Sequence, residues 1–449
     1  MVDQERKQNR LKILSSALER GTIVNVSTML NGLHPAEIAH LLESMPQHQR
    51  RLLWELINPE LDGDILTHVN DELRASLIME MGPQELVAAT EGLEPDDLAD
   101  IIGDLPDAVI SEVLQSMDEQ NRHRLEAMLS YPDNTAGGLM NTDTITVRPD
   151  VTIDVVLRYL RLRGTVPQMT DNLFVIDRED RYLGQLPVAV LLTQQPMISV
   201  AEVMSRETES IPAAMKASEV ASLFEHRDLI SAPVVDEGQK LIGRITIDDV
   251  VDVIRDEAEH TMMSMAGLDE QDDMFAPVMV SARHRGMWLG INLLTALLAS
   301  WVIGQFADTI DKIVVLAVLM PIVASMGGIA GSQTLTLVIR GIALGQIGAS
   351  NSRQLLYKEL AVSMLNGLLW AAIVAVVVIA WFGSYQIGLV IGAAIVINLL
   401  CAAFAGATIP MVLRRLGADP ALGGSVMLTT VTDVVGFVVF LGLATFFLL

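Results

Sequence analysis

The stretch SVMLTTVTDVVGFVVFLGLATFFLL, residues 425–449, is apolar apart from a few hydroxyl side chains and one carboxylate, Asp433. It is longer than the roughly 20 residues that a helix needs to cross a bilayer. An ionised carboxylate in hydrocarbon costs at least about 2.5 kcal/mol, so a membrane helix that carries one usually turns it toward a partner, a cavity or an ion path. The stretch therefore predicts a membrane helix with Asp433 as a candidate ligand for a conducted cation.

Other apolar runs lie at residues 288–306, 313–339, 355–382 and 387–413, and the last run begins at residue 426. Each is near or above bilayer length, so we expect five spans in a membrane domain, residues 283–449. The polar start MVDQERKQNR lacks the apolar core of a signal peptide, which predicts a cytoplasmic N-terminus. All Lys and Arg residues of the membrane domain except Lys312 then lie on the cytoplasmic side, as the positive-inside rule expects. We therefore expect a multi-pass protein of the plasma (inner) membrane with its C-terminus outside.

Charge divides the chain into two parts. Residues 283–449 hold five acidic and eight basic residues, which leaves 50 of the 55 acidic and 22 of the 30 basic residues to residues 1–282. The formal charges are therefore +3 and −28. Nucleic acid is an unsuitable partner, because phosphate binding needs Lys and Arg. Carboxylate-rich surfaces bind hard divalent cations, although such a surface also keeps a protein soluble. The single cysteine, Cys401, excludes an intrachain disulfide.

A first repeat organises the N-terminal region. LHPAEIAHLLESMP, residues 33–46, recurs as LEPDDLADIIGDLP, residues 93–106, and MGPQELVAATEG, residues 81–92, has the same helix start. Proline in the first turn followed by apolar residues at helical spacing is typical of short helix pairs stacked in a solenoid. Residues 1–130 are therefore expected to form an all-α superhelical domain.

A second repeat has an offset of 59 residues: LFVIDREDRYLGQ, residues 173–185, recurs as APVVDEGQKLIGR, residues 232–244. In each copy a helix-periodic segment precedes two short apolar strands joined by a turn. The pattern resembles a tandem pair of CBS domains, at residues 131–200 and 201–246. Such pairs commonly act as regulatory sensors and often bind adenine nucleotides.

The CBS resemblance implies at most one intact nucleotide site. In the second copy Gly243, Thr246 and Asp249 nearly meet the family's phosphate and ribose pattern, with a basic residue at one apolar place. In the first copy Pro187 and Val190 stand at the Thr and Asp places. ATP is thus one candidate ligand, and a purely structural or ion-sensing pair is the interpretation that we favour.

Residues 247–282, which precede the membrane domain, are predicted to begin with a long acidic helix. Several of its carboxylates share a face at three- and four-residue spacing, so they repel one another unless a cation bridges them to another acidic surface. Asp96 and Asp100, four residues apart on the superhelical domain, offer such a surface. An ordinary solvated helix is the alternative. The candidate metal ligands in the helix are Asp248, Asp249, Asp252, Asp256, Glu257 and Glu259.

Small and polar residues interrupt the second span, in PIVASMGGIAGSQTL, residues 321–335. Proline and glycine can free carbonyls that replace part of an ion's hydration shell, and tight helix packing explains the glycines equally well. In the last span Thr429, Thr432 and Asp433 share a face at helical spacing. The pore-lining candidates are Pro321, Gly328, Gly331, Gln333, Thr429 and Thr432.

These motifs are similar, over essentially the whole chain, to those of the MgtE family of magnesium channels. The order matches: a helical N domain, paired CBS domains, an acidic connecting helix, and five spans that end in the pattern TT-x-x-D-x-x-GF, residues 429–437. The resemblance implies a homodimer with a pore on its two-fold axis, Asp433 as the carboxylate that holds hydrated Mg²⁺, and Asp419 at the cytoplasmic pore mouth. It also implies that the acidic residues of the N domain and connecting helix bind regulatory Mg²⁺.

Two departures from the family pattern bear on function. Ile329 stands where the family usually has Asn in GGNxGxQ, which bears on ion selectivity. His260 and Thr261 stand where the connecting helix usually has an acidic pair, which favours gating that is weaker or pH-sensitive.

Two other function classes explain part of the sequence. A transporter of another divalent cation, such as Co²⁺, Mn²⁺ or Ca²⁺, would share nearly every feature. A CBS-based membrane sensor without flux would explain the soluble part and leave Asp433 unexplained. An enzyme is not expected, because the sequence has no recognisable pair of nucleophile and base and its His residues are scattered.

Overall fold

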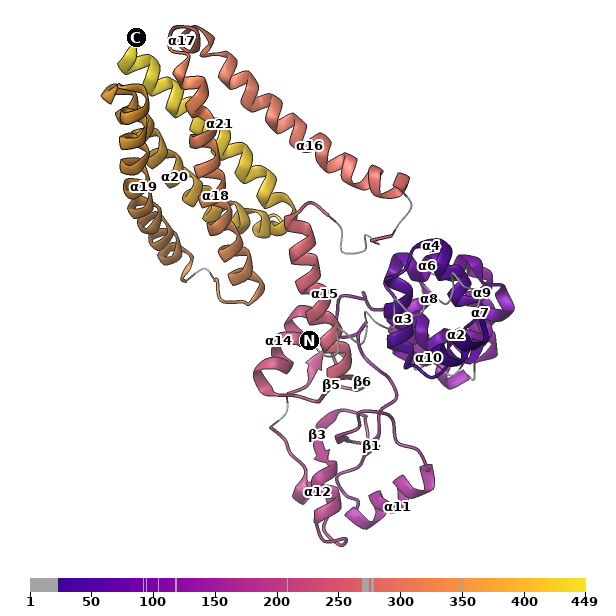
Figure 1. Ribbon diagram of the computed structural model, residues 1–449. Coiled ribbons are helices and arrows are strands. Elements are labelled where there is room, and N and C mark those ends of the chain that lie inside the picture. The colour runs from indigo at the N-terminus through magenta and orange to yellow at the C-terminus, as the bar shows by residue number, and fades with distance from the viewer. Residues whose placement is uncertain are drawn as a thin grey trace. The chain divides into compact units, whose positions relative to one another are not determined.

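The computed structural model describes residues 23–449 except residues 92, 94, 104, 118, 208, 269–273, 276, 277 and 349 (Figure 1). The chain divides into two compact units. The first unit comprises Met1–Ala258 and Gln271–Pro277, and the second comprises Glu259–Glu270 and Val278–Leu449.

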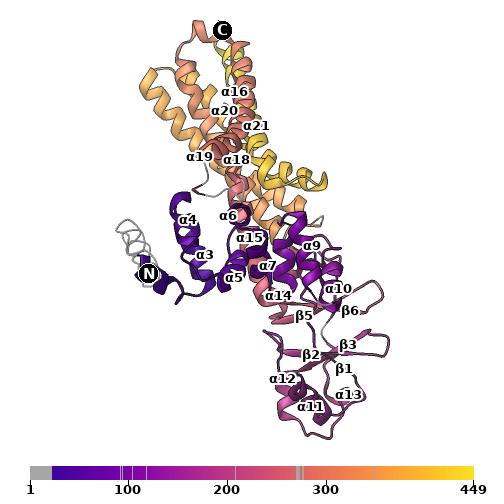
Figure 2. The ribbon, with the colours of Figure 1, turned by 90° about the vertical axis from the view of Figure 1, so that its right-hand side faces the viewer.

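Short helices wind into a superhelix in the N-terminal part of the first unit (Figures 1 and 2). Proline begins α3, where the His34 side chain accepts a hydrogen bond from the Ala36 amide and Glu37 completes the capping box. One apolar core runs through the helices and includes the fully buried Ile38 and Leu42. The helices are α2 (Ile23–Leu30), α3 (Pro35–Glu43), α4 (Gln47–Trp54), η1 (Pro59–Leu61), α5 (Asp62–His68), α6 (Asp71–Glu80), α7 (Pro83–Thr90), α8 (Pro95–Ile102), α9 (Asp107–Ser116) and α10 (Glu119–Met128).

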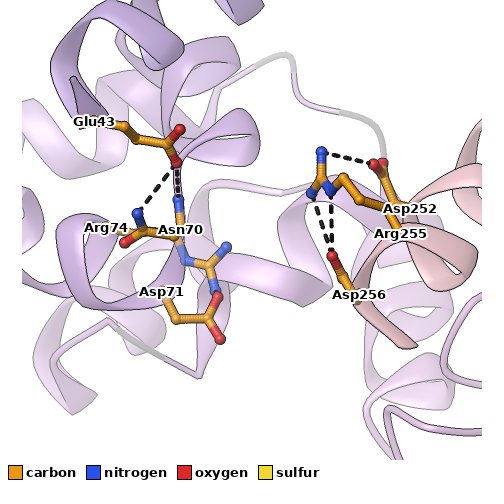
Figure 3. A network of polar contacts seen from close by, with 7 residues as sticks. All are labelled: Glu43, Asn70, Asp71, Arg74, Asp252, Arg255 and Asp256. Carbon is orange, nitrogen blue, oxygen red and sulfur yellow. Dashed lines mark hydrogen bonds and ion pairs between the residues drawn. The ribbon is translucent and has the colours of Figure 1, made fainter. Parts of the chain in front are cut away.

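Polar contacts join neighbouring helices of this superhelix. Glu43, at the end of α3, accepts hydrogen bonds from the Asn70 backbone amide at 2.9 Å and from its side-chain amide at 3.2 Å (Figure 3). Asn70 in turn caps α6 by accepting from the Leu73 amide. The last residue of α3 therefore holds the N-cap residue of α6 in place.

Two α/β modules of the same construction follow. Each has a three-stranded sheet in which the first strand is parallel to the second and the second is antiparallel to the third. The turns match as well, since Asp180 and Gln239, 59 residues apart, have φ angles of 62° and 61°. The elements are β1 (Thr146–Val147), α11 (Ile153–Arg163), β2 (Asn172–Ile176), β3 (Tyr182–Pro187), α12 (Val188–Thr193) and α13 (Val200–Val203), then β4 (Ile211–Pro212), α14 (Ala217–Arg227), β5 (Ser231–Val235), β6 (Leu241–Thr246) and α15 (Ile247–Met265).

Among its described residues, the second unit contains five helices that are long and apolar enough to cross a membrane. Helix α20 is the most buried of them and packs against α18, α19 and α21, while α16 packs against α21. Figure 1 shows α18 to α21 gathered into a bundle. The helices are α16 (Val278–Gly304), α18 (Val315–Ala343), α19 (Ser352–Phe382), α20 (Tyr385–Arg415) and α21 (Pro420–Leu448), with the short α17 (Ala307–Lys312) between the first two. The predicted fold class, a helical superhelix, a pair of α/β modules and five apolar helices, is confirmed.

Candidate functional site

A cavity of about 840 Å³ lies along α18 and α21 of the second unit. On α18 its lining residues recur at three- and four-residue spacing, so they form one face of the helix. Several of them carry hydroxyl or amide groups that can bond to water. The lining consists of Ala324, Ser325, Gly328, Ile329, Ser332, Gln333, Thr336, Leu337 and Arg340 from α18, with Thr429 and Asp433 from α21.

Asp433 supplies the carboxylate of this cavity. It is half-buried, and Thr429, one turn earlier on α21, lies on the same face. Within the described part of the chain the Asp433 carboxylate has no hydrogen-bond or ion-pair partner, whereas the Thr429 hydroxyl donates to the Ser425 carbonyl at 2.9 Å. The oxygens of Asp433 are therefore available to a ligand in the cavity.

Three of the predicted pore-lining residues line the cavity: Gly328, Gln333 and Thr429. The other three do not. Gly331 is buried, and a Cβ atom there would lie 2.8 Å from Leu428 Cδ1. The Thr432 side chain is fully buried and donates to the Thr429 carbonyl at 3.1 Å. Pro321 is exposed near the beginning of α18 and lies outside the lining.

Several residues that line the cavity were not among the pore-lining residues predicted from the sequence. They are the hydroxyl residues Ser325, Ser332 and Thr336 and the basic residue Arg340. A signal was present, because steps of three or four residues from Gly328 along α18 reach each of them. Ile329, noted as a departure from the family pattern, also lines the cavity and is 59% exposed.

Asp419 occupies a different place from Asp433. It is the N-cap of α21, and its carboxylate accepts hydrogen bonds from the Ala421 amide at 2.8 Å and the Leu422 amide at 3.1 Å. His260 Nε2 lies 3.4 Å from the same carboxylate. Fourteen residues of helix at about 1.5 Å each separate Asp419 from Asp433 by about 21 Å. The two carboxylates therefore form two separate candidate sites along α21.

The carboxylates of α15 lie mostly on an exposed surface. Arg255, which the sequence analysis overlooked, lies between Asp252 and Asp256, with its Nη1 and Nη2 atoms 3.4 Å from their respective carboxylates (Figure 3). Part of the repulsion expected on this face is therefore already compensated. The Thr246 hydroxyl donates to Asp248 and Asp249 at the start of the helix. Exposed carboxylates also occur at Glu257 and Glu259.

The structure describes no preformed metal centre: among its described residues, no group of three or more His, Cys, Asp or Glu side chains could hold a metal ion. Asp96 and Asp100 lie on α8, and their side chains are outside the described residues. A divalent ion at the acidic surfaces would therefore need ligands from two surfaces, or one or two carboxylates completed by water.

The candidate nucleotide residues are engaged in contacts within the chain. A Cβ atom on Gly243 would lie 2.8 Å from Met140 Sδ, so β6 is in close contact with Met140 at this glycine. Thr246 is buried, and its hydroxyl donates to Asp249 at 3.2 Å. Arg244 is 3% exposed and donates to the Gln168 carbonyl at 2.6 Å. The three residues are therefore held in place by contacts within the chain.

Three models of known protein families match parts of the chain. The model described as the MgtE intracellular N domain matches residues 33–134, the CBS domain model matches residues 136–192 and 200–256, and the model described as a divalent cation transporter matches residues 320–443. The magnesium transporter MgtE of Thermus thermophilus is 30% identical over 438 residues, which cover 96% of this chain and 97% of that protein. The chain belongs to the MgtE family.

The chain is also similar to other magnesium transporters. The magnesium transporter MgtE of Bacillus subtilis is 26% identical over 431 residues, which cover 96% of each chain. Among solved structures, the cytosolic domain of the Mg²⁺ channel MgtE in complex with ATP has 30% identity, covers 54% of this chain and 98% of that chain, and gives a TM-score of 0.48. The soluble part of a magnesium transporter has 20% identity, covers 56% of this chain and 99% of that chain, and gives a TM-score of 0.47.

The MgtE match includes the whole cavity lining, because the divalent cation transporter model begins at residue 320 and ends at residue 443. The family recognised from the motifs is thereby confirmed. With five apolar helices, this MgtE protein is a multi-pass membrane protein.

Proposed function

We propose that this MgtE protein is a Mg²⁺-selective channel for magnesium uptake and that Asp433 holds the permeating ion. The observation that carries the proposal is the Asp433 carboxylate itself. It faces a cavity whose lining combines small and polar residues with the apolar Ile329 and Leu337, and no side chain of the described residues forms an ion pair with it. A carboxylate kept in this state within a membrane domain is a functional-site candidate.

The cavity suits an ion that keeps its water. Mg²⁺ prefers oxygen ligands but dehydrates reluctantly, so a wide polar path serves it better than a cage of protein ligands. The hydroxyls of Ser325, Ser332 and Thr429 and the amide of Gln333 can bond to the water shell. Flux is downhill in this proposal, since the sequence contains no GxxxxGK[ST] motif for nucleotide hydrolysis.

The proposed pore is formed by a homodimer. One chain supplies one Asp433, and a two-fold axis along the cavity would bring two carboxylates to one divalent ion. Two-fold dimers are the commonest oligomers. In the proposed orientation the first unit is cytoplasmic and the C-terminus is outside, because basic residues such as Arg283, Arg340 and Arg414 then lie on the cytoplasmic side.

Cytosolic Mg²⁺ closes the proposed channel. At high concentration the ion bridges the acidic surface of α15 and that of the superhelical domain and stabilises the closed state. At low concentration the carboxylates repel one another and the channel opens. The support is the exposure on α15 of carboxylates that no preformed metal centre of the described residues uses, among them Asp248, Asp252, Asp256, Glu257 and Glu259.

Mg²⁺ entry into proteoliposomes loaded with a Mg²⁺-sensitive dye tests conduction. We expect Asp433→Asn, which keeps the size of the side chain, to reduce entry at least about tenfold, because a contact with a charged group contributes about 1.5–3 kcal/mol. Asp308→Asn, at an exposed carboxylate of α17, is the matched control and leaves entry unchanged. Equal entry through the intact protein and Asp433→Asn would contradict the assigned role of Asp433.

The same liposomes separate the other function classes. Preferential entry of Co²⁺, Mn²⁺ or Ca²⁺ supports a transporter of another divalent cation. Absence of all cation entry through folded protein supports a CBS-based sensor without flux.

Patch recordings at high cytosolic Mg²⁺ test regulation. We expect the double variant Asp248→Ala with Asp252→Ala to stay open where the intact protein closes, because fewer carboxylates remain for the bridging ion. Glu219→Ala with Glu225→Ala removes two exposed carboxylates of α14 and is the control. Unchanged closure of the first double variant would rule out feedback through this face of α15.

A further inference from the structure

Asn398 is a polar residue in the interior of the bundle. It lies on α20 and its side chain is 0% exposed. Its Nδ2 atom donates to the Val323 carbonyl of α18 at 2.9 Å. Its Oδ1 atom is buried and has no hydrogen-bond partner among the residues that the structure describes.

Two glycines, one on each of the two helices that line the cavity, lie against this amide. A Cβ atom on Gly327 of α18 would lie 2.3 Å from Asn398 Nδ2, and one on Gly436 of α21 would lie 2.7 Å from the same atom. Cβ atoms do not approach other atoms so closely, so both helices reach the amide only because they present glycine there. Asn398 is therefore the point at which α18, α20 and α21 meet.

These contacts lie directly behind the cavity lining. Val323 and Gly327 each precede a lining residue, Ala324 and Gly328. Gly436 lies three residues, or about one turn, beyond Asp433. A change in how α18 or α21 rests on Asn398 therefore changes the distance between Asp433 and the polar face of α18.

The two polar atoms of the Asn398 amide have opposite effects on folding stability. The bond from Nδ2 fixes α18 against α20, whereas a buried acceptor without a donor costs about 1–3 kcal/mol. A leucine of similar size would remove both. We propose that Asn398 is a positioning residue of the ion path, whose amide sets the spacing of the two cavity walls at the expense of folding stability. This inference rests on the proposed conduction through the cavity.

The test compares Asn398→Leu with the intact protein in two measurements, thermal unfolding in detergent and entry of Mg²⁺ and Ca²⁺ into dye-loaded proteoliposomes. We expect the variant to unfold at the same or a higher temperature. We expect its Mg²⁺ entry to fall about fivefold, the factor for one neutral hydrogen bond, and its ratio of Mg²⁺ to Ca²⁺ entry to fall as well. Asn366→Leu, at an exposed position of α19, is the matched control and changes neither quantity.

Each outcome bears on the proposal. If the leucine variant loses stability and entry together with an unchanged ion ratio, Asn398 is only a packing residue and the inference is overturned. If it conducts like the intact protein with the same ratio, the inference fails while conduction through the cavity stands. If the intact protein itself admits no Mg²⁺, the proposed function fails and this inference fails with it.

Discussion

A single carboxyl group, Asp62, makes the stability of the superhelical domain depend on pH. It lies in the first turn of α5, where the helix dipole favours negative charge. Burial and, second, the charge of Glu85 nevertheless raise its pKa from 3.8 to about 7. Between these values the folded domain holds a proton that the unfolded chain has released. The contribution of this group to stability is therefore full below its unfolded pKa and is lost as the pH rises toward 7.

We expect Asp62→Asn to stabilise the domain at pH 8 and to have little effect at pH 4. The gain is about 1 kcal/mol, since solvent screens a group that is only half-buried. Hydrogen exchange of peptides from α5 and α7 in the full chain measures the effect, with Asp64→Asn, at an exposed neighbour, as the control. Equal protection of Asp62→Asn and the intact protein at pH 8 would refute the prediction.

Helical spacing predicts which residues share a face of a helix. It does not predict whether that face lines a cavity or packs against another helix. Thr429 and Asp433, four residues apart, line the cavity. Thr432 is buried and Gly436, again four residues on, lies against Asn398. The second pair lies three residues after the first, which on an α-helix is a rotation of only about 60°. The sequence could therefore single out Asp433 by the cost of its charge, whereas choosing between threonines required the positions of the neighbouring helices.

At the scale of helices, the lengths of the apolar runs predict the number of spans. They do not predict the residues at which the helices begin and end. The first span was predicted from residue 288, yet α16 begins at Val278. Arg283, His284 and Arg285 interrupt the apolar run. They do not interrupt the backbone hydrogen bonds of the helix, which are independent of side-chain polarity. Hydropathy thus predicts the membrane-embedded part, and the helix extends beyond it.

Helices α18 and α19 are joined by a buried carboxylate. Glu359 is 6% exposed and accepts a hydrogen bond from the Thr334 hydroxyl at 3.2 Å, and Lys358 Nζ lies 3.1 Å from its other oxygen. Thr334 directly follows Gln333 of the cavity lining. The contact therefore braces the side of α18 that faces away from the cavity.

We expect Glu359→Ala to lower the unfolding free energy by about 1–3 kcal/mol, because it leaves the buried Thr334 hydroxyl without its acceptor. Lys358→Ala keeps this hydrogen bond and removes an exposed ammonium, so it should cost only about 0–1 kcal/mol. Glu359→Gln keeps an acceptor for Thr334 and should fall between the two. Unfolding in detergent measures the three variants, and equal loss for Glu359→Ala and Lys358→Ala would contradict the bracing role.

At the scale of the whole molecule, α15 begins in the first unit and ends in the second. Its acidic part lies within the unit that carries most of the negative charge. Its end belongs to the membrane unit, where Met265 packs with Leu335 and Ala421, and His260 approaches Asp419. In the proposed feedback, Mg²⁺ that neutralises the acidic face would act on a helix that also contacts α18 and α21, which line the cavity. This continuity is the physical basis of the proposed feedback.

The central claim is that Mg²⁺ permeates past Asp433, and current across a planar bilayer that contains the purified protein tests it most directly. With unequal Mg²⁺ on the two sides and little on the side of the first unit, we predict a current that reverses near the Mg²⁺ equilibrium potential and disappears in Asp433→Asn. A current that reverses elsewhere, or one that persists unchanged in Asp433→Asn, would contradict the account.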